Sequence, residues 1–269
     1  MNAAQEIELE NIRGWLSTRC GIHYPDKKRE LLIQRLSRVQ RAFNIDSIAD
    51  LGQRIRSGSD GEIELAVMHA ASTNHTYFFR ELDTLDQFRN MILPTLQGKP
   101  EIRIWSAACS TGDEAYTIAI LIAEALGDAG LARTSILGTD ISQPVVQRAE
   151  AGVFGERQIE RVPDYIRRKY FSPIGVGQFQ IVKKIRDRCT FRRLNLKVQP
   201  YPFRNKFQVV FCRNVLYYFD IPDQKATLEA IHNVTEDGGW LVTSVTERVR
   251  DLGTPWKTIS SGLSRKGNV

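Results

Sequence analysis

The sequence predicts an α/β protein in which an all-helical N-terminal domain precedes a larger domain built around a parallel sheet. Up to about residue 70, the apolar residues recur only at helical spacing. After Ala71, strand-like runs alternate with helical patterns, which is typical of a sheet covered by helices on both faces. We expect the domains at residues 1–70 and 71–269, with a small antiparallel β-subdomain inserted at residues 171–194.

Four helical patterns make up the first domain. Gly21–Asp26 separates the first two, and either Asp46 or Ser47 is placed to cap the third. Arg35, Arg38 and Arg41 recur every three residues along the second. The predicted helices are Glu6–Cys20, Lys27–Phe43, a third that carries Ile48, Leu51 and Ile55, and Glu62–Ala70.

The second domain contains four strand-like runs with helical patterns between them. The runs are Ile102–Ser106, Ser135–Thr139, Phe207–Cys212 and Trp240–Val245, and the helices are Glu114–Leu126, Gln143–Ala151 and Asp223–Asn233. The inserted β-subdomain is different, because Phe179–Lys184 and Cys189–Arg193 alternate in polarity after a glycine-containing loop. We expect these two segments to pair as an antiparallel hairpin.

Composition sets broad limits on the class of protein. With 42% hydrophobic and 25% charged residues, the chain is typical of a globular protein, and no apolar run reaches the roughly 18 residues of a membrane span. The polar start shows no signal peptide, and four scattered cysteines suggest a reduced, cytoplasmic protein without a metal site. The net charge of +6 indicates either a solvated basic surface or an acidic partner.

The most informative segment is Trp105–Glu114, which follows a strand and precedes a helical pattern. Small residues and a glycine after a strand are how a Rossmann-like sheet opens its ligand crevice, because the backbone can approach a ligand and the helix start offers free N–H groups. The carboxylates of Asp113 and Glu114 would repel a phosphate. The turn therefore predicts a ligand with amine or hydroxyl groups, such as S-adenosylmethionine (SAM).

Asp140 ends the next predicted strand. A carboxylate at this place accepts two hydrogen bonds at once, which the two hydroxyls of a ribose supply. A lone aspartate there can instead cap the following helix. Beside the Trp105–Glu114 turn, we favour ribose.

Two further segments combine polar and aromatic residues. In Thr73–Arg80, the arginine can pair with a ligand carboxylate, although the segment is also compatible with a linker that packs its aromatic side chains into the core. In Val209–Phe219, a buried strand ends in Arg213 and Asn214, at the sheet edge where α/β proteins bind ligands. The tyrosines that follow either position an acceptor or pack on the next helix.

Taken in order, five segments resemble the CheR family of SAM-dependent methyltransferases, which act on chemotaxis-receptor glutamates. The segments are Thr73–Arg80, Trp105–Glu114, Asp140, Asn195-Leu196 and Cys212–Tyr218. The family has an N-terminal helical domain and a Rossmann-like SAM-methyltransferase domain with an inserted antiparallel β-subdomain, which is the organisation expected above.

The resemblance implies a role for particular residues. The methionine end of SAM would meet Asn74, Thr76 and Arg80, while Glu114 would contact the cofactor at the first turn and Asp140 would bind its ribose. Tyr218 would lie beside the methyl group. The pocket would be lined by Asn195, Leu196, Arg213 and Asn214. We assign positioning roles in catalysis to Tyr218 and Arg213 and name no catalytic base, with the role of His75 left open. The product would be S-adenosylhomocysteine (SAH).

The expected partner is the acidic helical cytoplasmic region of chemotaxis receptors. We expect the protein to be a monomer that neither inserts into a membrane nor binds nucleic acid. Candidate docking charges lie on the second helix and near the hairpin, and for any single one a solvated surface position is the alternative. They are Arg35, Arg38, Arg41, Lys183, Lys184, Arg186, Arg192 and Arg193.

The chain departs from the family pattern at Asp113 and Ala115, where the family has glutamate and proline, and its Ser172–Gly177 loop is short. The short loop favours receptor recognition that needs no C-terminal tether peptide.

Two other functions stay open. One is methylation of nucleic acid or another protein, although Cys212–Val215 replaces the Asn-Pro-Pro-Tyr type of loop used on base amines. The other is a SAM-binding module without catalysis.

Overall fold

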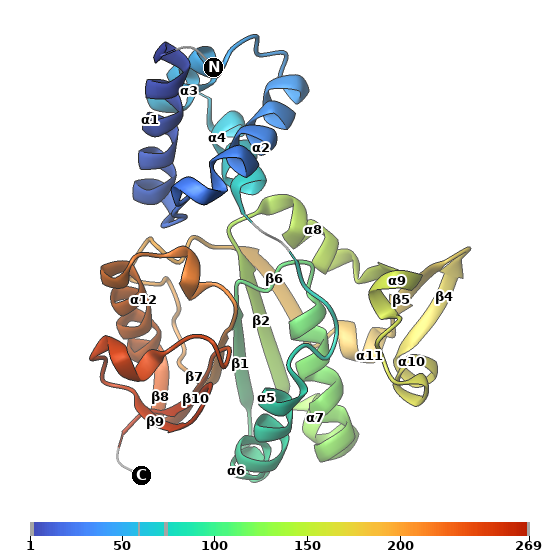
Figure 1. The fold of residues 1–269 in the computed structure, drawn as a ribbon. Helices are drawn as coiled ribbons and strands as arrows, with labels where there is room; N and C mark the ends of the chain where they lie inside the picture. The colour runs from blue at the N-terminus through green and yellow to red at the C-terminus, as the bar shows by residue number, and fades with distance from the viewer. Residues whose placement is uncertain (1–2, 59, 73–74, 268–269) are drawn as a thin grey trace.

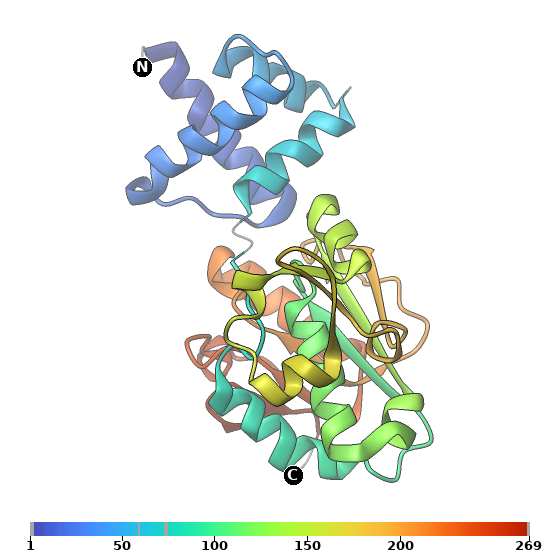
Figure 2. The same ribbon diagram turned by 90° about the vertical axis from the view of Figure 1, so that its right-hand side faces the viewer.

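The computed structural model describes residues 3–58, 60–72 and 75–267. Figure 1 shows a helical domain above a larger α/β domain, with a small sheet projecting from one side, and Figure 2 shows the same two bodies from a second direction. The predicted fold class is confirmed: an all-helical domain precedes a sheet-based domain with a small antiparallel sheet.

The helical domain is held by one apolar core. Leu9, Leu16, Leu36 and Leu51 are fully buried, because they recur at helical spacing on faces that meet at the centre of the group. The cap of the third helix is Ser47, whose hydroxyl accepts a hydrogen bond from the backbone N–H of Asp50. The helices are α1 (Ala3–Cys20), α2 (Arg29–Ala42), α3 (Ile48–Ser57) and α4 (Gly61–Ala71), with a 3₁₀ turn η1 (Asp26–Lys28) ahead of α2.

The main sheet has seven strands in the order β6-β2-β1-β7-β8-β10-β9. The first five are parallel, and β10 pairs antiparallel with both of its neighbours. The strand predicted at 240–245 is displaced, because β8 begins at Thr235 and ends at Val242, so that only its last three residues fall within the predicted run. The strands are β1 (Ile102–Ala107), β2 (Thr134–Asp140), β6 (Cys189–Arg193), β7 (Phe207–Cys212), β8 (Thr235–Val242), β9 (Lys257–Ser260) and β10 (Leu263–Arg265).

Both faces of this sheet are covered. Along β1, Ile104 belongs to one apolar cluster and Trp105 to another, because successive side chains of a strand point to opposite faces. The face with Ile104 packs on α5 (Leu82–Gln87), the π-helical turn η2 (Phe88–Ile92), α6 (Leu93–Leu96), α7 (Asp113–Ala132) and α8 (Gln143–Ala151). The other face packs on α12 (Ile221–Asn233) and the 3₁₀ turns η3 (Leu216–Tyr218) and η4 (Val249–Leu252).

Within the described residues, α7 is the one helix long and apolar enough to cross a membrane. It packs in the core of the α/β domain, with Ile118, Ala119 and Ile122 fully buried. A helix that is buried inside a domain is apolar for that reason.

The predicted hairpin is wrong in its pairing. Cys189–Arg193 lies in the main sheet as β6, parallel to β2, and the small sheet is formed by β3 (Val153–Gly155), β4 (Phe171–Gly175) and β5 (Gln178–Ile181). The single turn α11 (Lys183–Arg186) carries the chain from one sheet to the other. Alternating polarity is common to any strand with one exposed face, so it could not show which sheet a strand joins. The helices beside the small sheet are α9 (Glu156–Ile159) and α10 (Asp164–Tyr170).

Candidate active site

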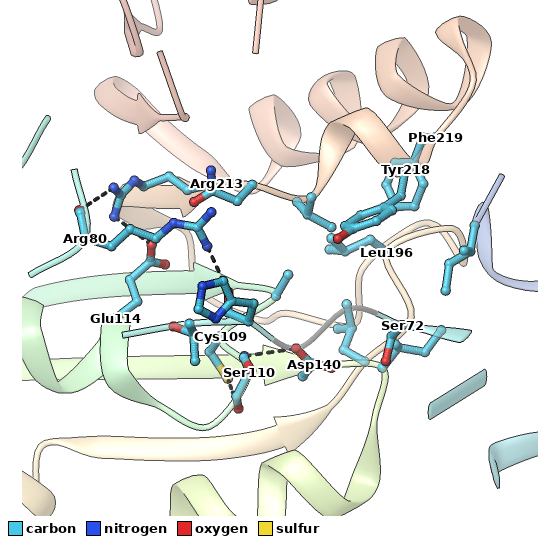
Figure 3. A pocket seen from close by; sticks show the side chains of 18 of the residues that line it. Ser72, Arg80, Cys109, Ser110, Glu114, Asp140, Leu196, Arg213, Tyr218 and Phe219 are labelled. Atoms are coloured by element: carbon cyan, nitrogen blue, oxygen red, sulfur yellow. Dashed lines mark hydrogen bonds and ion pairs between the residues drawn. The ribbon is translucent and has the colours of Figure 1, made fainter. Parts of the chain in front are cut away.

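A cavity that is partly open to solvent lies at the C-terminal ends of β1, β2 and β7, against the end of α1 and the segment that follows it. Open α/β sheets bind their ligands at this edge. The lining comes from both domains, and Figure 3 shows many of its side chains. The polar lining residues include Thr76, Arg80, Glu114, Asp140 and Asn214.

The turn after β1 is tightly folded. Ala108, Ser110 and Gly112 all have positive φ, at 65°, 50° and 90°. A Cβ on Gly112 would lie 3.0 Å from the Cβ of Ala149 and 3.2 Å from the ring of Phe191, and this crowding together with the positive φ favours glycine there. The turn thereby brings the start of α7 against the edge of the sheet.

Asp140 is held by the backbone. Its two carboxylate oxygens accept the N–H groups of Ser110 and Ser142, each at 2.9 Å, and the residue is 7% exposed. Burial raises the pKa of this carboxyl, while these hydrogen bonds act in the opposite direction. Each oxygen keeps a further lone pair, so the carboxylate can also accept both hydroxyls of a diol in the cavity.

The carboxylates of Asp113 and Glu114 face different surroundings. Asp113 is fully buried and accepts a hydrogen bond from the hydroxyl of Thr111 at 2.6 Å, and its Oδ1 has no hydrogen-bond partner among the described residues. Glu114 lines the cavity. Of the two carboxylates, Glu114 faces the cavity and Asp113 does not, because adjacent residues of a helix point about 100° apart.

Arg213 lies between two carboxylates. Its side chain is 2% exposed, and its terminal nitrogens lie 3.1 Å from Glu114 and 3.3 Å from Glu81. It also donates a hydrogen bond to the carbonyl oxygen of Arg80 at 2.6 Å, and Glu114 accepts a second hydrogen bond from Ser106 at 2.7 Å. The guanidinium thus fixes Glu114 at the cavity wall (Figure 3).

A residue that the sequence analysis missed, Glu247, organises the loop after β7. Its buried carboxylate accepts four backbone N–H groups at 2.8–3.0 Å, and burial raises its pKa. These hydrogen bonds hold the backbone of Asn214, which has φ 59°. The side-chain amide of Asn214 in turn donates a hydrogen bond to the carboxylate of Glu81. The donors are the N–H groups of Asn214, Val215, Leu216 and Ser244. An acidic residue shortly after the end of β8 was the only sequence signal.

The helical domain closes the cavity at the loops that carry Tyr218 and Asn195. Cys20 and Ile22 line the cavity, which the sequence analysis also missed. The backbone N–H of His23 donates to the carbonyl of Tyr218 at 2.8 Å, and the amide of Asn195 donates to the carbonyl of Arg19 at 2.8 Å. The side chain of Asn195 is therefore partly occupied in holding the two domains together.

Leu196 and Tyr218 are both placed at the cavity. Leu196 is 6% exposed, so it offers an apolar wall. The hydroxyl of Tyr218 lies 3.5 Å from that of Tyr217, which is 50% exposed. In Figure 3, Tyr218 and Glu114 lie on opposite sides of the pocket.

The linker before α5 both packs on the core and lines the cavity. Phe78 is buried and packs edge-on against Phe154 and Phe171, while Thr76 and Arg80 line the cavity. Arg80 donates a hydrogen bond to the carbonyl of His75 at 3.0 Å. Asn74, another predicted cofactor residue, lies outside the described residues.

Arg35, predicted as a docking charge, is engaged inside the protein. It donates to the hydroxyl of Tyr24 and to the carbonyls of Ala71 and Ser72, at 2.7, 2.7 and 3.2 Å. Arg38 and Arg41 are exposed on the same helix. Near the small sheet, Lys183, Lys184 and Arg192 each pair with a carboxylate.

Known protein families and individual proteins both match most of this chain. The model of the SAM-binding domain of CheR methyltransferases matches residues 74–263, and that of their all-alpha domain matches residues 7–68. The chemotaxis protein methyltransferase of Borreliella burgdorferi is 34% identical over 86% of this chain and 84% of its own length. Chemotaxis protein methyltransferase 1 of Pseudomonas aeruginosa is 34% identical over 93% of each chain. Chemotaxis protein methyltransferase Cher2 of Pseudomonas putida is 33% identical over 91% of this chain and 92% of its own.

Proposed function

Because this chain belongs to the CheR methyltransferase family, we propose that it transfers the methyl group of SAM to glutamate side chains in the acidic helical cytoplasmic region of chemotaxis receptors. Its methyl donor is SAM, as the sequence resemblance implied. The relatives at 33–34% identity are chemotaxis protein methyltransferases, and their matches extend over most of both chains, which supports chemotaxis as the process.

The observation that carries the proposal is the arrangement of two carboxylates in one cavity. Asp140 has lone pairs free for a ribose, and Glu114 faces the same space from the start of α7. An adenosine with a cationic sulfonium and amino group fits such a wall, whereas a pyrophosphate would be repelled by it. Leu196 and the neighbouring Ile141 add apolar surface on which an adenine ring can pack.

The reaction needs little acid–base chemistry from the chain. SAM supplies a methyl carbon on a positively charged sulfur, and a glutamate side chain, with an ordinary pKa of about 4.3, is already an anion at pH 7. The residues of the site therefore have to align the acceptor and exclude water. We assign the alignment to Tyr218, whose loop is fixed by Glu247 and His23, and the placement of Glu114 to Arg213.

The proposal is tested by methyl transfer from radiolabelled SAM. A purified receptor cytoplasmic fragment is offered in one reaction, and RNA, DNA or no acceptor in the others. We expect label only in the receptor, released as volatile methanol by mild base, because a carboxyl methyl ester hydrolyses in base and an N-methyl group does not. Label in nucleic acid would contradict the proposal, as would SAH binding measured by calorimetry without ester formation on any receptor.

A further inference from the structure

The ring of Tyr77 lies beside two guanidinium groups. The central guanidinium carbon of Arg161 is 4.9 Å from the ring centroid, and that of Arg80 is 5.7 Å from it. Both distances are within the range of cation–π contact. Tyr77 and Arg80 line the cavity, whereas Arg161 is an exposed residue of the turn between α9 and α10. The ring thus joins the cavity wall to a segment that belongs to the small-sheet side of the molecule.

Neither arginine forms an ion pair with a carboxylate in the part of the chain that the structure describes. This sets them apart from Arg213 and from Lys183, Lys184 and Arg192, whose charges are balanced by acidic residues. Stacking on a ring holds a guanidinium in place and leaves its N–H edge available to a carboxylate. Two positive charges without an acidic partner among the described residues therefore lie beside one ring, Arg80 in the cavity wall and Arg161 outside it.

We propose that Arg161 positions the acceptor by pairing with an acidic residue of the receptor helix next to the substrate glutamate. The inference rests on the function proposed above and adds a specificity residue to it. Arg80 already donates to His75 and lines the cavity, so the charge left for an incoming protein is the one outside the cavity, on Arg161. The positive charge also attracts an acidic receptor helix before it docks.

The alternative is that Arg161 only anchors its own turn on Tyr77. Two substitutions separate these roles. Arg161→Gln removes the charge, and Arg161→Lys keeps it without the planar fork. Arg157→Gln is the matched control, because Arg157 is an exposed arginine on the neighbouring α9 and carries the same charge.

The experiment measures kcat and KM for a purified receptor cytoplasmic fragment at low and high salt, and SAH affinity by calorimetry. For Arg161→Gln, we expect kcat/KM for the receptor to fall about tenfold at low salt, mainly through KM. The loss should shrink at high salt, where charges are screened. SAH affinity should stay within about twofold, Arg161→Lys should recover part of the loss, and Arg157→Gln should behave as wild type.

Three outcomes would overturn the inference while leaving the proposed function intact: an unchanged receptor KM in Arg161→Gln, an equal loss in the Arg157→Gln control, or a fall in SAH affinity as large as that in kcat/KM. If the unmodified enzyme transfers no methyl group to any receptor fragment, the proposed function itself fails, and the acceptor role of Arg161 fails with it.

Discussion

The two sides of the cavity hold their carboxylates by different means. On the β2 side, Asp140 is fixed by backbone N–H groups of Ser110 and Ser142. On the β7 side, Glu81 and Glu114 share one buried cation, Arg213, and accept further hydrogen bonds from side chains only. Backbone donors cannot be removed by substituting their side chains, whereas a buried ion cluster depends on each member. The β7 side is therefore where single substitutions should be most damaging to the fold, and the β2 side where they should be most selective for the ligand.

The largest effect is expected from Arg213→Met. Glu81 and Glu114 would stay partly buried, with side chains 21% and 15% exposed, but would lose their cation. Removing one partner of a buried pair typically costs about 3–5 kcal/mol in the free energy of unfolding. Chemical denaturation at pH 7, followed by circular dichroism, measures this change.

The matched control is Arg103→Met. Arg103 also meets two carboxylates, Glu101 and Glu236, but it lies near the opposite end of β1 and its side chain is 23% exposed. A more exposed pair contributes less, so we expect about 1 kcal/mol or less. Equal costs for the two variants would show that burial of the cluster does not set its strength.

The sequence was enough to predict most of this edge of the sheet. Glu114, the strand-end Asp140 and residues of the Cys212–Tyr218 segment were predicted at the ligand site and line the cavity, because strand ends and tight turns leave local signals. The pairing of Arg213 with Glu81 and Glu114 was not predictable in this way. These residues are 132 and 99 positions away from it along the chain, and only the sheet order brings them together.

Glu247 and the Cys20–Ile22 segment were missed for a related reason. The four N–H groups around Glu247 come from two loops that meet only because β7 and β8 are neighbours. The wall formed by Cys20 and Ile22 depends on how the helical domain docks, where Gly21 lies so close to Phe219 that a Cβ would be 2.6 Å from its ring. Contacts between domains leave no periodic pattern in the sequence.

Asp113 differs from the carboxylates on both sides of the cavity. Its carboxylate has neither a cation, as Glu81 and Glu114 do, nor backbone N–H donors from two other residues, as Asp140 does; it accepts a hydrogen bond from Thr111. Burial raises its pKa to about 6, from 3.8 for an ordinary aspartate, so the folded state binds the proton more tightly than the unfolded state. Stability contributed by this group is therefore present below about pH 4 and is lost as the pH rises through about 6. Asp113→Asn should remove that pH dependence.

The measurement is the difference in unfolding free energy between Asp113→Asn and the unmodified protein at pH 4 and pH 7. At pH 4 we expect almost no difference in unfolding free energy. At pH 7 we expect Asp113→Asn to be more stable than the unmodified protein by up to about 3 kcal/mol, since each pKa unit corresponds to about 1.4 kcal/mol. Asp237→Asn, at a side chain 88% exposed, should change stability by less than about 0.5 kcal/mol at either pH. A difference at position 113 that does not vary with pH would contradict a raised pKa there.

The smallest and most selective effect is expected from Asp140→Asn. An amide can accept the N–H of only one of Ser110 and Ser142, and it is a weaker acceptor for ribose hydroxyls than a carboxylate. Hydrogen bonds to a charged group contribute about 1.5–3 kcal/mol, so SAH affinity should fall about 10- to 100-fold.

Calorimetry with SAH and with an analogue lacking both ribose hydroxyls measures the coupling between residue 140 and those hydroxyls. The unmodified protein should bind the analogue much more weakly than SAH, and the variant should bind the two almost equally. If the variant still discriminates between them as strongly as the unmodified protein, the ribose is held elsewhere, and the backbone-held carboxylate on the β2 side serves the fold rather than the ligand.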